Sequence, residues 1–83
     1  MTVLRLLGSQ ATLASASNVG FAKLVRVLNN AAAVQLITQK NAAGTTIATV
    51  TLGVGESVLI QKVSTDTLTG AVTCLATSVA FAN

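Results

Sequence analysis

Few side chains in this 83-residue sequence could take part in acid–base or nucleophilic chemistry. It has no histidine, tyrosine or tryptophan, one cysteine (Cys74), and two carboxylates, Glu56 and Asp66. Catalysis by proton transfer or by a nucleophile needs a titratable group that a second group orients. The combinations that remain are a carboxylate with a lysine, which is far more often a surface ion pair, or Cys74 alone. We therefore expect a protein that is not an enzyme.

The same side chains give no pattern for a metal or a cofactor. Asp66 stands among threonines, but calcium requires several carboxylate and carbonyl ligands. We expect Asp66 to bond backbone amides of its own turn instead. Glu56 and Lys62 are expected to form an ion pair across strands or between subunits, and Cys74 is expected to be a small buried apolar residue. No cofactor and no bound metal are expected.

The basic residues are scattered along the sequence and do not form a cluster. They give a net charge of +3 and are Arg5, Lys23, Arg26, Lys40 and Lys62. Nucleic-acid-binding proteins cluster such residues and add aromatic stacking surfaces. Because Phe21 and Phe81 are the only aromatic residues, we expect no nucleic-acid partner.

Membrane insertion and secretion are also not expected. No window approaches the roughly 18 continuous apolar residues that a spanning helix requires. Residues 1–7 resemble the start of a signal peptide, but Gly8, Ser9 and Gln10 interrupt the apolar run after two leucines. A first strand over residues 3–7 is the better interpretation.

The elements that position these residues are predicted to be short strands. Segments rich in Val, Leu, Ile and Thr alternate with Gly, Asn, Ser and Asp, which predicts an all-β fold. We expect one domain over residues 1–83, a small β-sandwich or barrel of about seven to eight short antiparallel strands, with residues 1–20 as an extended arm. The expected strands are residues 3–7, 10–14, 23–28, 34–39, 45–52, 57–63, 71–76 and 79–81.

Two local patterns refine this prediction. The Asn-Ala-Ala-Gly sequence of residues 41–44 is expected to close a hairpin, with the glycine in the left-handed position. Apolar residues also recur at helical spacing from Phe21 to Ala32, so an amphipathic helix over residues 20–37 is the alternative there. The valines in this stretch and the Asn29-Asn30 pair favour two strands instead.

The composition favours a chain that associates with copies of itself or with another protein. Apolar residues make up 52% of the sequence and charged residues 8%, whereas soluble domains average about 25% charged residues. A domain of this size has a marginal core and usually needs disulfides, a metal or oligomerisation. With one cysteine and no ligand cluster, a homo-oligomer is expected.

Two predicted strands, residues 23–28 and 57–63, carry apolar residues on both faces. Strands that are covered on both faces have this pattern, and in one small sandwich the second cover has to come from another subunit. The residues expected to form this contact surface are Leu24, Val25, Arg26, Val27, Val58, Leu59, Ile60 and Lys62.

Five runs between roughly residues 18 and 70 have a shared likeness: KLVRVLNN, VQLITQ, GESV, IQK and TDTL. Together they resemble small β-rich virion structural proteins of tailed bacteriophages, particularly those that infect cyanobacteria. This resemblance implies a particle component without enzymatic activity, located in the virion and bound to the major capsid protein or another virion protein.

On this basis we expect a capsid decoration (cement) protein that binds the outer head surface and bridges major capsid subunits. The alternatives are a tail, neck or fibre component of the virion, and a module that binds the host surface. The missing tryptophan and tyrosine argue against sugar binding by such a module, because carbohydrate faces usually stack on aromatic rings.

Overall fold

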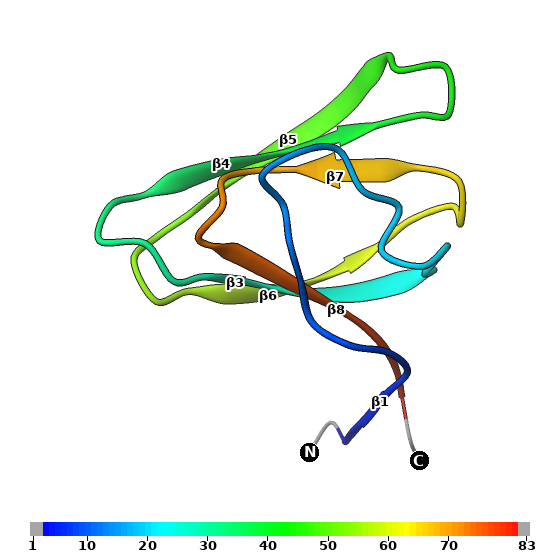
Figure 1. Ribbon diagram of the computed structural model, residues 1–83, viewed down its shortest axis with the longest axis horizontal. Coiled ribbons are helices and arrows are strands. Elements are labelled where there is room, and N and C mark those ends of the chain that lie inside the picture. The colour runs from blue at the N-terminus through cyan, green and yellow to red at the C-terminus, as the bar shows by residue number, and fades with distance from the viewer. Residues whose placement is uncertain (1–2, 82–83) are drawn as a thin grey trace.

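The computed structural model describes residues 3–81, which form eight strands and no helix (Figure 1). The strands are arranged in two antiparallel sheets, so the all-β prediction is confirmed. Their bounds are β1 Leu4–Leu6, β2 Ala11–Thr12, β3 Leu24–Asn29, β4 Gln35–Lys40, β5 Thr46–Leu52, β6 Ser57–Gln61, β7 Thr67–Thr69 and β8 Cys74–Phe81.

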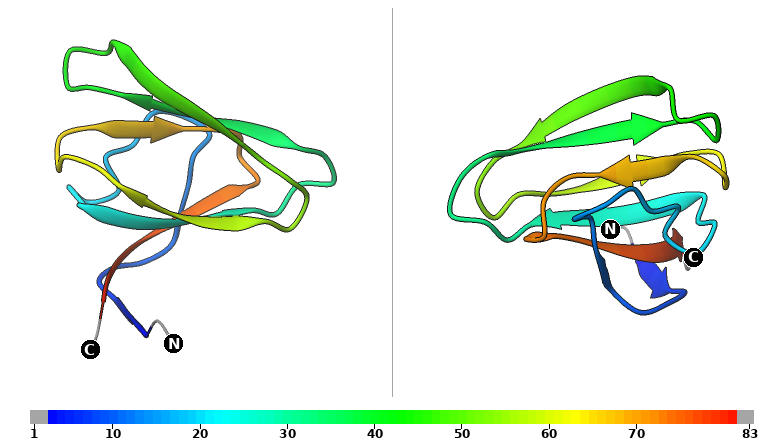
Figure 2. Two further views of the ribbon diagram at one scale, coloured as in Figure 1. Left: turned by 180° about the vertical axis from the view of Figure 1, so that it is seen from behind. Right: turned by 45° about the horizontal axis from the view of Figure 1, so that its top comes forward.

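The last strand, β8, lies inside the larger sheet. That sheet has the order β1-β8-β3-β6, and β2 pairs with β8 beside β1. β2 pairs with the first part of β8 and β1 with its last part, while β3 pairs along the other side of β8. The smaller sheet has the order β5-β4-β7. β5 and β7 are therefore the outermost strands of the smaller sheet, and β6 and the β1/β2 side are the outermost positions of the larger one (Figures 1 and 2).

Alternation along the strands places the core between the sheets. In β3, Val25, Val27 and Asn29 are buried, whereas the residues between them point outward. The helix considered for residues 20–37 is thus wrong, because Leu24–Asn29 form a strand in which Val25 and Val27, two residues apart, share the buried face. The buried apolar cluster consists of Leu13, Val19, Ala22, Val25, Val27, Ile37, Leu52, Leu68, Cys74 and Ala76.

Residues 11–17 close one side of the sandwich by crossing from the larger sheet to the smaller one. Ala11 and Thr12 pair with β8, and Ser17 then forms a bridge with Leu68 in β7. In this bridge Leu68 N donates to Ser17 O over 2.8 Å, and a further bond from Gly70 N to Leu13 O, also 2.8 Å long, holds the crossing. We call this the closed side and the opposite side, between β5 and β6, the open side.

Residues 3–20, the described part of the expected arm, pack onto the same chain. Residues 4–6 and 11–12 pair with β8, and Ser17 forms a bridge with Leu68 in β7. Residues 1 and 2 lie outside the described part. The hairpin at residues 41–44 is confirmed: Gly44 N donates to Asn41 O over 2.9 Å, and Gly44 has a φ of 84°.

The side chain of Asn29, at the end of β3, joins two connections between strands. Its amide nitrogen donates to the carbonyl oxygens of Ala33, Leu52 and Gly53 at 3.0 to 3.1 Å. Its amide oxygen accepts from Ala31 N over 3.0 Å. A fully buried asparagine with this many partners links the β3–β4 connection to the β5–β6 turn.

Candidate assembly interface

A two-stranded ribbon formed by β1 and the end of β8 projects from the body of the sandwich (Figures 1 and 2). Its residue pairs are Leu4 with Phe81, Arg5 with Ala80, and Leu6 with Val79. Leu6 is 72% exposed and Phe81 55% exposed. A two-stranded ribbon is marginally stable in water unless it packs against something else. These exposed apolar side chains form a surface of the kind that is often found at protein interfaces.

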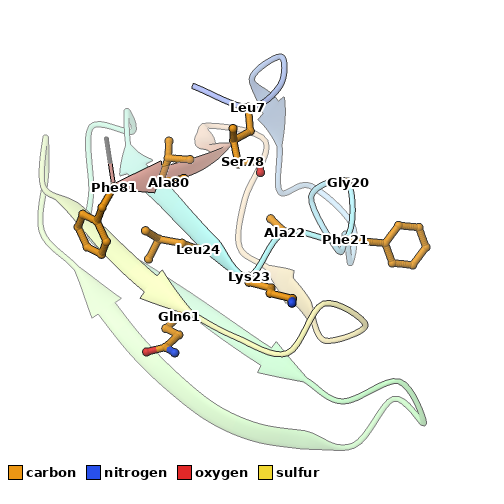
Figure 3. A pocket seen from close by; sticks show the side chains of 11 residues that line it. Leu7, Gly20, Phe21, Ala22, Lys23, Leu24, Gln61, Ser78, Ala80 and Phe81 are labelled. Carbon is orange, nitrogen blue, oxygen red and sulfur yellow. The ribbon is translucent and has the colours of Figure 1, made fainter. Parts of the chain in front are cut away.

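A hollow lies between this ribbon and residues 20–24. Its volume is about 670 Å³, and Leu7, Leu24 and Ala80 lie around it in Figure 3. Phe81 lies on the side of Leu24 and Gln61, whereas the ring of Phe21 points away from the other labelled side chains. Both phenylalanines of the chain thus border the same hollow.

The turn that carries Phe21 has an unusual backbone. Val19, Gly20 and Phe21 have consecutive positive φ values of 54°, 67° and 58°. Left-handed backbone costs a non-glycine residue about 1–2 kcal/mol, and a β-branched residue such as valine is rarely found there. The turn holds Phe21 63% exposed at its tip, while Val19 is buried. Strain of this kind persists only where surrounding contacts fix it, and it is concentrated at functional positions.

Polar contacts on both sides of this turn fix its conformation. Before it, Ser17 Oγ accepts from Val19 N over 3.1 Å, and Asn18 Oδ1 accepts from Phe21 N over 3.2 Å. After it, Lys62 Nζ donates to Ala22 O over 2.6 Å. The ammonium group thus connects the end of the turn to the segment that follows β6.

The hydrogen-bond partners of Lys62, Glu56 and Asp66 differ from those expected from the sequence. Lys62 is buried and donates only to backbone carbonyls in the described contacts, and Glu56 Oε1 accepts from Gly53 N over 2.7 Å. Within the chain, Glu56 and Lys62 therefore have different partners and form no ion pair. Asp66 accepts from Gln39 Nε2 over 3.0 Å, so its carboxylate reaches the neighbouring strand β4 rather than its own turn.

Burial of Lys62 makes the free energy of unfolding depend on pH. Desolvation lowers the pKa of Lys62 below its usual value of 10.5, and the attraction of Asp66 offsets this in part. Between the lowered pKa and 10.5, the unfolded chain binds more protons than the folded chain, so the free energy of unfolding increases as the pH rises through this interval. We expect urea unfolding at about pH 8 and about pH 10 to show this increase, and Lys62→Met to remove it. An equal increase in the variant would contradict the assignment to Lys62.

The eight residues expected to form a contact surface occupy three different places. Leu24, Arg26 and Leu59 point outward from the larger sheet, where Arg26 and Leu59 are neighbours across β3 and β6. Val58 and Ile60 are partly buried and pack against the core. They also line a groove on the open side.

The other three expected contact residues are corrected by the structure. Val25 and Val27 have no exposed surface and Lys62 is buried, so none of them offers surface to a partner. Apolar residues on both faces of β3 do not require a second subunit, because Leu24 and Leu28 are only half-buried on the outer face.

Sequence reasoning missed the residues of the ribbon and of the left-handed turn. Leu6, Leu7 and Phe81 come together only because β1 pairs with the end of β8, 77 positions away along the chain by the pairing of Leu4 with Phe81. One signal was available, since a chain with two aromatic residues in total has few candidates for a contact anchor.

The described residues contain no constellation for metal binding. No group of three or more His, Cys, Asp or Glu residues lies close enough together in residues 3–81 to hold a metal ion. Cys74 is buried, as predicted. No helix long and apolar enough to span a membrane occurs in this part of the chain. In comparisons with known proteins, no protein-family model, curated protein or solved structure matches this chain.

Proposed function

We propose that this chain is a bacteriophage capsid decoration protein that binds the outer head surface and bridges neighbouring major capsid subunits. The observation that carries the proposal is the apolar surface formed by the projecting ribbon, the hollow beside it and Phe21. On a chain of 83 residues, so much unpaired apolar surface favours a protein that works by contact with another protein. The resemblance of residues 18–70 to small virion proteins is the reason for proposing a virion protein as this partner.

The proposed mechanism is physical. Packaged DNA presses outward on the head and pulls capsid subunits apart, and a bridging protein opposes this separation with the interface that it buries. A protein that binds only the expanded shell stabilises that shell in proportion to the logarithm of its concentration over its dissociation constant. Many copies on one particle make individually modest interfaces effective.

Phe21 is the proposed anchor of this contact. Aromatic residues carry a large share of the binding energy in protein interfaces, especially where they enter a pocket on the partner. The left-handed turn fixes the position of Phe21 before binding, through Asn18, Val19 and Lys62. Little conformational entropy is then lost when the ring is covered.

Sedimentation of the purified chain with expanded heads of the phage that encodes it tests the proposal. We expect hundreds of bound copies per head and a higher melting temperature of the shell. A few copies per particle, found at one vertex or in the tail, would favour a neck or tail component instead. A chain that remains in the supernatant and leaves the shell melting temperature unchanged would rule out the decoration function.

Replacing Phe21 by glycine should change stability and binding in opposite directions. Relief of about 1–2 kcal/mol of left-handed strain exceeds the roughly 0.5–1 kcal/mol of extra chain entropy of glycine. The variant should therefore unfold at slightly higher urea concentration, while its affinity for heads falls about tenfold or more. Val72→Ser, which removes another exposed apolar side chain, should leave binding unchanged. Full head binding by Phe21→Gly would show that Phe21 is not the anchor.

A further inference from the structure

Two unpaired strand edges, those of β5 and β6, lie on the open side of the sandwich, while β1 and β2 at the other end of the larger sheet pair only with β8. Within residues 3–81, β5 pairs only with β4, and β6 pairs only with β3. Six of the seven residues of β5 are exposed, and β5 contains no proline and no charged residue. Charges, prolines and short strands are the usual protection of an edge against added strands. β5 lacks all of them.

An apolar groove of about 270 Å³ runs between the two open edges. Ala48 and Val50 of β5 line it from the smaller sheet, and Val58 and Ile60 of β6 line it from the larger sheet. Val50 stays 40% exposed although it points toward the interior side of its sheet beside Ile37. The open side therefore presents unpaired backbone groups and apolar side chains together.

We propose that a second copy of this chain binds the open side by pairing its β5 with β5 in antiparallel orientation. A two-fold axis at Thr49, the central residue of β5, places Thr49 opposite Thr49 of the second copy, and Ala48 opposite Val50. Both members of the latter pair line the groove, so the two grooves join across the axis. The two smaller sheets become one continuous six-stranded sheet with the order β7-β4-β5-β5-β4-β7.

The charged residues near the two ends of β5 are compatible with a second copy in antiparallel orientation. Lys40 lies on β4 beside Thr46, at the start of β5 and one strand in from the edge. Glu56 lies in the turn after the end of β5, where its carboxylate accepts from Gly53 N. Antiparallel pairing brings the start of each β5 next to the end of the other. It thus places Lys40 of one copy and Glu56 of the other at the same end of the joined sheet, whereas parallel pairing would put like charges at the same end. Pairing of unlike charges fixes register and orientation more than it adds affinity.

Sedimentation velocity of the full-length chain over a range of concentrations tests the dimer. We expect a particle of twice 8.3 kDa at the higher concentrations. Thr49→Lys places two ammonium groups opposite each other at the axis and should weaken the dimer at least tenfold. Thr38→Lys is the matched control, because Thr38 is the cross-strand neighbour of Thr49 on β4, one strand from the edge. It should leave the dimer unchanged.

A charge exchange tests the orientation independently. Lys40→Glu and Glu56→Lys should each weaken the dimer several-fold, and the double variant should recover most of the loss. If Glu56 mattered only because it accepts the hydrogen bond from Gly53 N, the double variant would not recover dimer affinity, because lysine cannot accept that bond.

Three results would overturn the proposal. The first is a monomer at every concentration. The second is a dimer that Thr49→Lys does not weaken. The third is a dimer that Leu59→Lys on β6 dissociates instead. Because the test uses the chain without capsids, its outcome is separate from that of the decoration experiment.

Discussion

Replacing Asn29 by alanine is expected to reduce the free energy of unfolding by about 3–4 kcal/mol. The substitution removes a buried amide that binds the carbonyl oxygens of Ala33, Leu52 and Gly53 and the amide of Ala31. Each buried group left without a partner costs about 1–3 kcal/mol. Since a domain of this size has a total stability of only about 5 kcal/mol, the variant should retain about 1–2 kcal/mol, which leaves roughly 3–15% of the chains unfolded near room temperature.

Urea unfolding followed by circular dichroism measures this effect, and the neighbouring asparagine supplies the control. Asn30 is exposed, so Asn30→Ala should change the free energy of unfolding by less than about 0.5 kcal/mol. Asn29→Asp keeps an acceptor for Ala31 N but loses both donors, so it separates the donor contribution from that of the acceptor. An Asn29→Ala variant as stable as Asn30→Ala would mean that the hydrogen bonds of the Asn29 side chain make no net contribution to the free energy of unfolding.

Replacing Gly70 by valine should destabilise the chain by about 3 kcal/mol or more through overpacking. A Cβ at this position would lie 2.8 Å from Ile37 Cδ1, 3.1 Å from Cys74 Sγ and 3.2 Å from Cys74 Cβ. The end of the Ile37 side chain can move, but Cys74 belongs to β8 in the middle of the larger sheet. β7, which Gly70 directly follows, and β8 would have to separate to admit the new side chain.

Thermal unfolding and the reactivity of the Cys74 thiol both report on this change. Cys74 is buried, so labelling by a thiol reagent should be slow in the original chain and faster in Gly70→Val. Gly8→Val is the control, because no atom lies within 4 Å of a Cβ at Gly8. Adding Cys74→Ala to Gly70→Val should restore part of the stability. Equal stability and labelling rates in Gly70→Val and Gly8→Val would contradict the packing argument.

Most strands could be predicted from the sequence because their hydrophobic pattern and turn residues agree. The hairpin between β4 and β5 is an example, since its Asn-Ala-Ala-Gly turn can supply the required positive φ only at the glycine without strain. The predicted strands at residues 71–76 and 79–81 are instead one strand, β8. The sequence reasoning did not include β7, because three residues among Thr, Asp and Gly have the composition of a turn.

The candidate interface could be predicted only in part, because it depends on long-range pairing. Local composition does not reveal that β1 lies beside the end of β8, or that residues 11–17 leave β5 and β6 as the open edges. The left-handed turn was also beyond prediction, since Val19 and Phe21 belong to residue types that avoid positive φ. Tertiary contacts fix their conformation against local preference.

The position of β8 inside the larger sheet also determines when the chain can fold during synthesis. β1 and β2 pair with β8, which is synthesised after the other seven described strands, and β3 gains its second neighbour only at that point. On a ribosome, the hairpin of β4 and β5 can form early, but the sheet that carries the core cannot close until residues 74–81 have emerged. Folding should therefore be slow, as is typical of topologies dominated by contacts between distant residues. Until then the unprotected edge of β5 is exposed to other nascent chains, so cellular yield should depend on chaperones and on the rate of expression.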